Sequence, residues 1–151
     1  MKNILLIFSI TLAFSNNNLF AQKTWKGKGA GGSGTDFNTA SNWNPSGVPT
    51  ASDNVTIAIT SDATITLSAN ASIKNLTFTV SGNNNSAVLD AGSNTLTING
   101  TSSIDATSGN SSTTIGIGVN GGSSAGIVDF KGNVSLGPTS NNATAYFLGN
   151  A

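Results

Sequence analysis

Apolar residues along the chain recur as pairs with one residue between the two members. The pairs follow one another at nearly even intervals, and they are Ile57/Ile59, Leu76/Phe78, Leu96/Ile98, Ile115/Ile117 and Val134/Leu136. In a β-strand, residues i and i+2 point to the same face, so each pair predicts a strand with one apolar side. The residues inside the pairs are small or polar and are expected to face outward, namely Ala58, Thr77, Thr97, Gly116 and Ser135.

Clusters of Gly, Asn and Ser separate the apolar groups, and such clusters are typical of turns. A fixed long period with internal strands and turns indicates stacked repeats. We therefore expect an all-β fold, a parallel β-helix (β-solenoid) with about 19–20 residues per coil. A single coil cannot bury its apolar face alone, so stacked coils would share one core. Frequent turn signals also fit an antiparallel β-sandwich, which stays open as the alternative.

The segment ahead of the first pair departs from the repeat and is rich in aromatic residues, glycine and proline. Residues 22–53 are expected to form an N-terminal cap on the coils of residues 54–151. A cap is needed because an open solenoid end exposes unpaired backbone groups and apolar side chains. Trp25, Phe37 and Trp43 would supply the apolar area of this lid. The alternative is a ligand platform, in which Trp25 and Trp43 are exposed and stack against sugar rings.

The N-terminal segment, residues 1–21, has the features of a signal peptide. Lys2 precedes an apolar run over residues 4–14, and Ala21 provides a small residue at the expected cleavage site. The run is too short to cross a bilayer, which takes about 20 apolar residues. We expect residues 1–21 to be removed, leaving an extracellular or outer-surface protein with no transmembrane span.

The charged residues exclude several classes of function. All six bases are Lys and all six acids are Asp, so the net charge is zero and nothing indicates binding to nucleic acid. Cys and His are absent, which removes disulfides, thiolate metal sites and His-dependent nucleophilic triads. No acidic pair lies in an aromatic-lined local motif typical of a glycosidase. We expect no enzymatic activity and no cofactor.

One short stretch resembles a metal-binding repeat. The sequence GGSGTD at residues 31–36 matches the start of the calcium-binding nonapeptide, in which Asp and carbonyl groups from successive turns surround the ion. Such a site needs tandem copies, and the chain has a single one. Asp36 is therefore the candidate metal residue, with an ordinary loop as the alternative.

Three Thr-x-Thr triplets raise the possibility of an ice-binding array. They lie at residues 64–66, 77–79 and 95–97. An array of this kind needs equal spacing on one flat face, whereas the two intervals between these triplets are unequal. Threonine is also a common outward-facing strand residue, so no array is expected.

The chain resembles a recurrent N-terminal module of large secreted β-solenoid proteins from Bacteroidota, which are autotransporter-like or adhesin-like. The resemblance covers roughly residues 24–104, and it is carried by Trp25-x-Gly27, Asn42-Trp43, Gly47-Val48-Pro49, Asp53-Asn54-Val55-Thr56-Ile57, ASIKNLTF at 71–78 and SNTLTING at 93–100. It implies export, often by type IX secretion, and a surface or adhesive role. It implies no catalytic residues.

These observations predict an exported structural or adhesin-like segment of the cell surface. Its partners would be surface polysaccharide or other cell-surface components. The alternative is a carbohydrate-binding module or a fragment of a β-helix polysaccharide-degrading enzyme. Proteins of the resembling family usually continue over many further coils to a sorting domain, whereas this sequence stops at AYFLGNA, within an expected fifth coil. We therefore expect the chain to be truncated at its C-terminal side.

Overall fold

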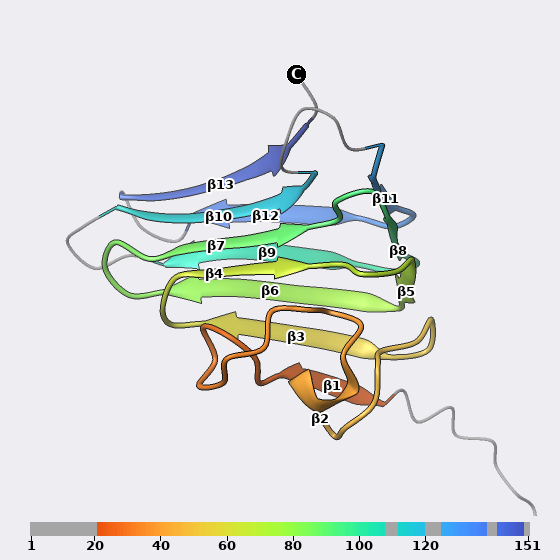
Figure 1. Cartoon of the computed structure of the whole chain (residues 1–151). Helices are drawn as coiled ribbons and strands as arrows, with labels where there is room; N and C mark the ends of the chain where they lie inside the picture. Colours follow the sequence, from red (N-terminus) through yellow and green to blue (C-terminus); the bar gives the residue numbers. More distant parts are fainter. Residues whose placement is uncertain (1–20, 108–111, 120–124, 139–141, 150–151) are drawn as a thin grey trace, which may run out of the picture.

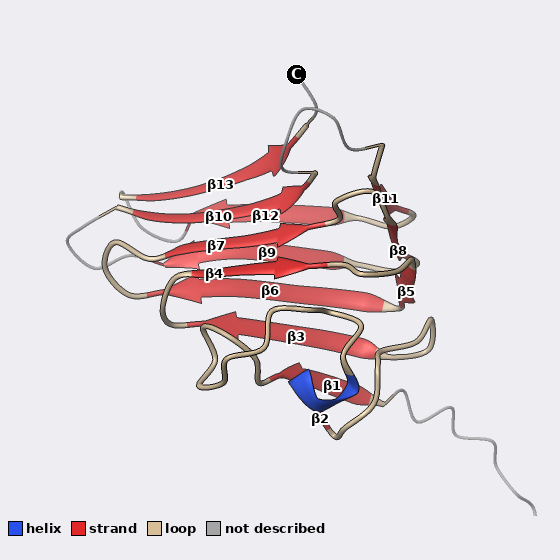
Figure 2. Ribbon diagram, in the orientation of Figure 1, coloured by secondary structure: helices blue, strands red, loops and turns tan. Residues whose placement is uncertain are grey.

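The computed structural model describes residues 21–107, 112–119, 125–138 and 142–149, which form a parallel β-helix with three sheets (Figure 1). The first sheet contains, in spatial order, β12 (Val134–Pro138), β9 (Ser102–Thr107), β6 (Asn75–Ser81), β3 (Asn54–Ile59), β1 (Gln22–Trp25) and β2 (Trp43–Asn44). The second contains β13 (Ala143–Leu148), β10 (Thr113–Gly118), β7 (Ser86–Asp90) and β4 (Ala63–Thr66). The third contains β11 (Ile127–Phe130), β8 (Thr95–Ile98) and β5 (Ala71–Ile73). A short 3-10 helix, η1 (Ala40–Asn42), precedes β2 (Figure 2).

The pairing between strands decides between the two expected folds. Every ladder between successive coils is parallel, and the antiparallel pair among the described strands is β1 with β2, at the N-terminal end. The strands follow one another around the three sheets through about four turns, and β12 and β13 belong to the last of them. The β-solenoid is therefore confirmed, and the antiparallel sandwich is excluded.

The predicted coil length and the predicted five coils are wrong. Val55 lies opposite Leu76, Leu76 lies opposite Ser102, and Ser102 lies opposite Val134. Each of these coils is longer than the spacing of the apolar pairs, and each is longer than the coil before it. The five apolar pairs lie on β3, β6, β8, β10 and β12 and so visit all three sheets. Their regular spacing arises because turns of different lengths happen to separate these strands evenly.

Inward-facing side chains stack in rows along the axis of the β-helix. On the first sheet Ile57, Phe78 and Ile104 occupy equivalent positions of β3, β6 and β9, and all three are fully buried. On the third sheet Ile73 and Ile98 form a similar buried row. Burial of each such side chain stabilises the fold by about 1.5–3 kcal/mol. The core is thus one continuous cluster that runs from the N-terminal cap into the third coil.

The residues between the members of each pair face outward, as predicted, with one difference in exposure. Ala58, Thr77 and Ser135 are exposed and Thr97 is half-buried. Gly116 is buried, because the ring of Tyr146 on the neighbouring strand β13 lies over it. A Cβ at position 116 would come within 2.8 Å of this ring.

Asparagine side chains at the corners tie each coil to the one before it. Asn75 Nδ2 donates to Asn54 Oδ1 at 2.8 Å, and Asn75 Oδ1 accepts from the backbone N–H of Thr101 at 2.7 Å. At another corner Asn94 Nδ2 donates to the carbonyl of Leu67 at 2.8 Å. An amide has both donors and an acceptor, so it can satisfy backbone groups that turns leave unpaired. This accounts for asparagine at the corners between strands.

Phe78→Asp and Thr77→Asp test the assignment of the two faces. Phe78→Asp puts a charge into the core, so we expect a loss of more than about 4 kcal/mol and of cooperative unfolding. Thr77→Asp on the outer face should change the free energy of unfolding by about 0.5 kcal/mol or less. Urea unfolding followed by circular dichroism measures both. Equal damage from the two substitutions would contradict the assigned faces.

Candidate functional site

The N-terminal cap, residues 22–53, continues the stacking of the coils as a partial extra coil. Its strand β1 pairs in parallel with β3 of the first coil. Further along, the carbonyl of Gly29 accepts a hydrogen bond from the N–H of Thr60 at 2.8 Å. The N–H of Phe37 then donates to the carbonyl of Thr66 at 2.8 Å, and the N–H of Thr66 donates to the carbonyl of Thr35 at 2.9 Å. The segment thereby covers the backbone edges of both β3 and β4.

Three aromatic rings close the apolar interior beneath this partial coil. Trp43 lies between Trp25 and Phe37 with edge-to-face geometry, and the ring centroids are 5.1 Å and 4.9 Å away. Trp43 Nε1 donates to the carbonyl of Phe37 at 2.7 Å, and Trp25 Nε1 donates to that of Lys28 at 3.1 Å. The exposed fractions are 2% for Trp25 and 0% for both Phe37 and Trp43. This burial fits the lid and contradicts the sugar platform, because neither indole face is open to a ligand.

Glycine in the loop after β1 lets the backbone approach the indole of Trp25. A Cβ at position 27 would lie 2.3 Å from an atom of this ring. Gly29 has a φ of +82°, a conformation that glycine adopts without steric cost, and its carbonyl then reaches Thr60. The glycine residues of this loop therefore allow the close packing of the cap.

Lys23 is a buried cap residue that the sequence pattern did not indicate. It lies opposite Val55, on the side of the sheet that faces the core, and is 9% exposed. Its stem covers the end of this inward row, as lysine stems often cover apolar surface. Its ammonium group donates to the carbonyls of Pro45 at 3.0 Å and Ser46 at 3.2 Å. The i, i+2 spacing of Lys23 and Trp25 could have indicated a shared face, but a lysine at an inward position is not expected.

Asp36, the candidate metal residue, joins the cap to the first coil. Its carboxylate accepts hydrogen bonds from the N–H of Asn38 at 3.0 Å and from the hydroxyl groups of Thr39 and Ser68, both at 2.9 Å. The N–H of Ser68 also donates to it at 3.3 Å. Burial raises the pKa of Asp36, but the bonds from Asn38, Thr39 and Ser68 outweigh this and hold the pKa below its ordinary value.

These contacts do not favour a metal ion at Asp36. Both carboxylate oxygens already accept hydrogen bonds from protein donors, whereas a calcium site needs several free oxygens around the ion. Across the described ranges no three Asp, Glu, His or Cys side chains lie close enough together to hold a metal. The arrangement makes Asp36 a latch between the cap and the turn after β4.

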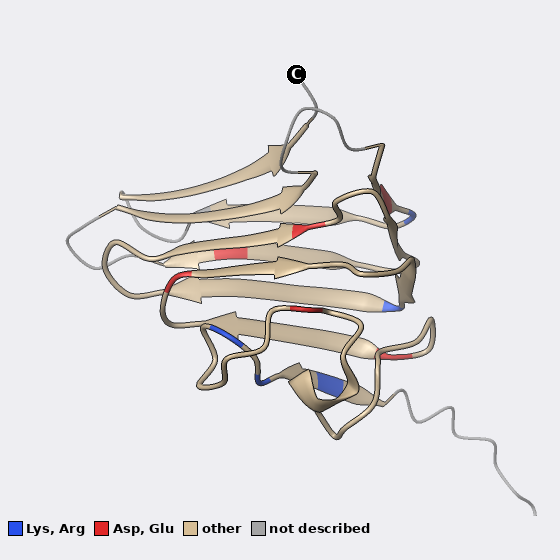
Figure 3. Cartoon of the chain, in the orientation of Figure 1, with Lys and Arg blue, Asp and Glu red and all other residues tan. Residues whose placement is uncertain are grey.

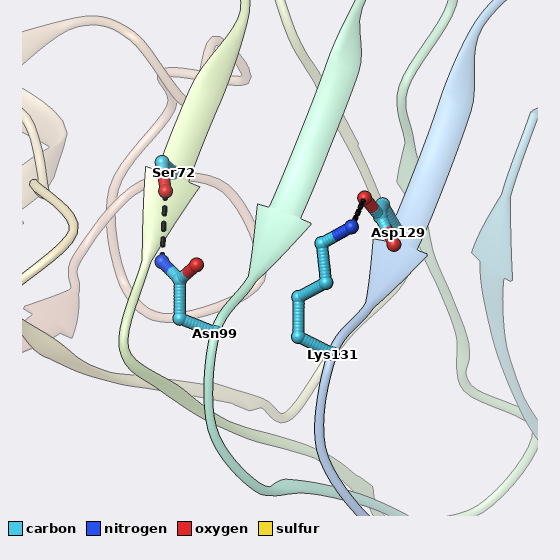
Figure 4. Close-up of polar contacts among 4 residues, drawn as sticks. All are labelled: Ser72, Asn99, Asp129 and Lys131. Carbon is cyan, nitrogen blue, oxygen red and sulfur yellow. Dashed lines mark hydrogen bonds and ion pairs between the residues drawn. The ribbon is translucent and has the colours of Figure 1, made fainter.

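Charged residues are few along the β-helix (Figure 3), and among the described residues Asp129 and Lys131 form an ion pair of 2.6 Å beside the row Ser72–Asn99 (Figure 4). A row of hydroxyl side chains crosses the first sheet at equivalent positions, namely Thr56, Thr77, Ser103 and Ser135. The three Thr-x-Thr triplets lie on β4, β6 and β8, which belong to three different sheets. The unequal intervals in the sequence reflect this placement, and the triplets form no common array.

At the other end of the described coils, apolar side chains are exposed, and no local sequence pattern indicated this. Val134, Leu136 and Phe147 occupy inward positions of β12 and β13 yet are 37%, 38% and 51% exposed. Phe147 also lines a cavity of about 360 Å³, whose other apolar lining residues are Ile117, Val119, Val128, Phe130 and Leu148. The exposure arises because β12 and β13 are the last described strands of their sheets.

No known family model, curated protein or solved structure matches the chain. Residues 1–20 of the expected signal peptide lie outside the described residues. Within the described part, no helix is long and apolar enough to cross a bilayer.

Asp36→Asn should weaken the cap in a pH-dependent manner. Because the folded-state pKa of Asp36 is lowered, its stabilisation is present above the unfolded-state pKa, near about pH 4, and is lost as pH falls through the folded-state value. The difference in free energy of unfolding between the native chain and the variant should therefore be largest near neutral pH and shrink below about pH 4. Urea unfolding from pH 2.5 to 7, with about half-unit steps, measures it.

Ser68→Ala is the matched variant for this measurement. It removes the hydroxyl donor to the Asp36 carboxylate and leaves the carboxylate in place. Asp36→Asn should change the free energy of unfolding less in the Ser68→Ala background than in the native chain. A flat curve for Asp36→Asn in the native chain would contradict the latch.

The fluorescence of the two tryptophans tests their burial directly. Soluble polysaccharides added to the native chain should leave the intensity and wavelength of emission unchanged, because both indoles are covered. Acrylamide should quench the emission weakly in the native chain and strongly after unfolding in urea, which shows that the signal responds to exposure. A saturable shift with any polysaccharide would restore the ligand platform.

Proposed function

We propose that this protein is an exported, non-catalytic scaffold of the cell surface, an adhesin-like β-solenoid segment that acts as a stiff spacer. The observation that carries the proposal is the parallel hydrogen-bond ladder of the first sheet, which continues from β1 to β12 without interruption. A rod with its backbone bonds directed along its axis resists bending and stretching. It can hold other surface groups at a fixed distance from their anchor.

The chemistry of the described residues supports a structural role. The corner asparagines bond to backbone groups of neighbouring coils, and the acidic residues are dispersed over separate strands and turns. A carboxylate that acts as a general base must be within hydrogen-bond reach of a substrate proton, whereas the oxygens of Asp36 accept hydrogen bonds from Thr39 and Ser68. The polar side chains thus serve the connection between coils.

The location at the cell surface is supported by the sequence. Residues 1–21 have the pattern of a signal peptide, and the cap resembles that of secreted Bacteroidota solenoids. Surface polysaccharide or other cell-surface components are the partners that this role implies. A chain without cysteine has no disulfides to stabilise it outside the cell. The parallel ladders and the aromatic lid stabilise the fold instead.

Deletion of one whole coil tests the spacer function. Removing residues 76–101 joins Asn75 to Ser102, which occupies the position opposite Leu76 in the intact ladder. Because coils contact only their neighbours, we expect a folded protein that is shorter by about 5 Å, the spacing of adjacent strands. Circular dichroism, urea unfolding and small-angle X-ray scattering measure fold, cooperativity and length.

A shorter deletion, of residues 76–95, is the matched control. It follows the spacing of the apolar pairs in the sequence but would place β8 of the third sheet beside β3 of the first. We expect it to lose cooperative unfolding. Loss of the fold in the whole-coil deletion, or equal tolerance of both deletions, would contradict a spacer built from interchangeable coils.

A further inference from the structure

The coils lengthen at the two corners that border the second sheet. Between equivalent ladder positions, the corner from the first to the second sheet comprises, in successive coils, residues 60–62, 81–86 and 107–114. The corner from the second to the third sheet comprises residues 67–70, 91–95 and 119–127. The corner that returns to the first sheet stays short, at residues 74–75, 99–101 and 131–133. Stacking requires no such growth, and insertions on one side of a repeat protein often mark its binding face.

The outer face of the second sheet carries a row with apolar character, unlike the hydroxyl row of the first sheet. Its members occupy equivalent outward positions of four strands that lie side by side (Figure 1), namely Thr64, Val88, Gly116 and Tyr146. We call these four residues the tyrosine row. Val88 is 8% exposed although it points away from the core. The row therefore places apolar surface on a face where polar side chains are expected.

The ring of Tyr146 lies on the coil before its own. A Cβ at position 116 would come within 2.8 Å of the ring atoms Cε2 and Cζ and within 3.1 Å of the hydroxyl oxygen. An aromatic side chain in this arrangement covers backbone that a glycine leaves exposed. Tyr146 is half-buried, which fits a ring with one face against the protein and one face in solvent. The position of the ring is thus set by the preceding strand, β10.

Polar groups border the tyrosine row on both sides. On one side Thr114 Oγ1 donates to Ser86 Oγ at 3.1 Å, and these two residues occupy neighbouring outward positions of β10 and β7. On the other side lies Asp90, which is the single charged residue in the strands of this sheet. Apolar surface with a few placed polar groups is the usual composition of a small-ligand site.

We propose that the tyrosine row binds a neutral polysaccharide, one pyranose ring of which stacks on Tyr146. The face of a pyranose ring presents C–H groups that pack against an aromatic ring, and its edge carries hydroxyl groups that bond to side chains such as Thr114 and Asp90. A sheet whose single charge is negative disfavours an acidic sugar, so the ligand is uncharged. The inference rests on the proposed function, because surface polysaccharide is the partner proposed there.

The single tyrosine of the chain provides a direct probe of the site. Labelling with 3-fluorotyrosine gives the full chain one ¹⁹F resonance, which comes from Tyr146. Cellohexaose, mannohexaose and maltohexaose are the neutral ligands to be added, and trigalacturonate is the acidic one. We expect a saturable shift of the resonance with at least one neutral ligand at millimolar concentration and none with trigalacturonate. Tryptophan emission should stay unchanged throughout, because both indoles are buried in the cap.

Variants of the row separate binding from stability. Gly116→Ala displaces the ring and keeps the tyrosine, so affinity for the neutral ligand should fall by about tenfold, the scale of a lost stacking contact. Tyr146→Ala should have a similar effect, whereas Tyr146→Phe keeps the ring and should retain most of the affinity. Ser103→Ala, at an exposed outward position of the first sheet, is the matched control and should change nothing. Isothermal titration calorimetry measures affinity, and circular dichroism with urea unfolding checks that each variant is folded.

Three outcomes would overturn the proposal. They are the absence of a saturable shift with all three neutral ligands, undiminished affinity in folded Tyr146→Ala, and tighter binding of trigalacturonate than of any neutral ligand. None of them bears on the spacer function, because the coil deletion measures length and not binding. Loss of the fold in the coil deletion together with a saturable ¹⁹F shift in the full chain would reject the spacer and keep the site.

Discussion

The parallel ladder between coils is the interaction on which the whole structure depends. Each strand satisfies its N–H and C=O groups through the coil before it and the coil after it, because a parallel strand cannot pair within its own turn. Coils in the interior of the β-helix thereby pair their backbone N–H and C=O groups on both sides. The first and last coils cannot do so, since each has one row of unpaired backbone groups and one layer of uncovered apolar side chains. The aromatic lid lies at the first of these ends.

At the N-terminal end a short segment closes the ladder because its side chains are large. A partial coil has too few positions to build an aliphatic layer, and each aromatic ring covers the area of several small side chains. Trp43 packs edge to face against Trp25 and Phe37, and all three rings are buried. Asp36 then fixes this lid laterally through Ser68, which lies in the turn after β4, far along the chain.

Sequence patterns predicted the local part of this structure well and the long-range part poorly. Alternation with a period of two is local, so the inward Phe78 and outward Thr77 could be assigned correctly. Coil length depends on turns whose lengths change along the chain, so the even spacing of apolar pairs indicated a wrong period. For Asp36 the sequence pointed to a polar site, but the donors of Ser68 that occupy its oxygens are distant in sequence. The lid and the sugar platform differ only in burial, which a sequence does not show.

The unlike ends give the molecule a direction. Head-to-tail polymerisation needs two complementary surfaces on one molecule, and the aromatic lid removes one of them by covering the edges of β3 and β4. Strand addition at the N-terminal end of the β-helix is therefore blocked by the cap, whose backbone already pairs with β3 and bonds to Thr66 of β4. The cap that stabilises the fold thus also prevents association through this end.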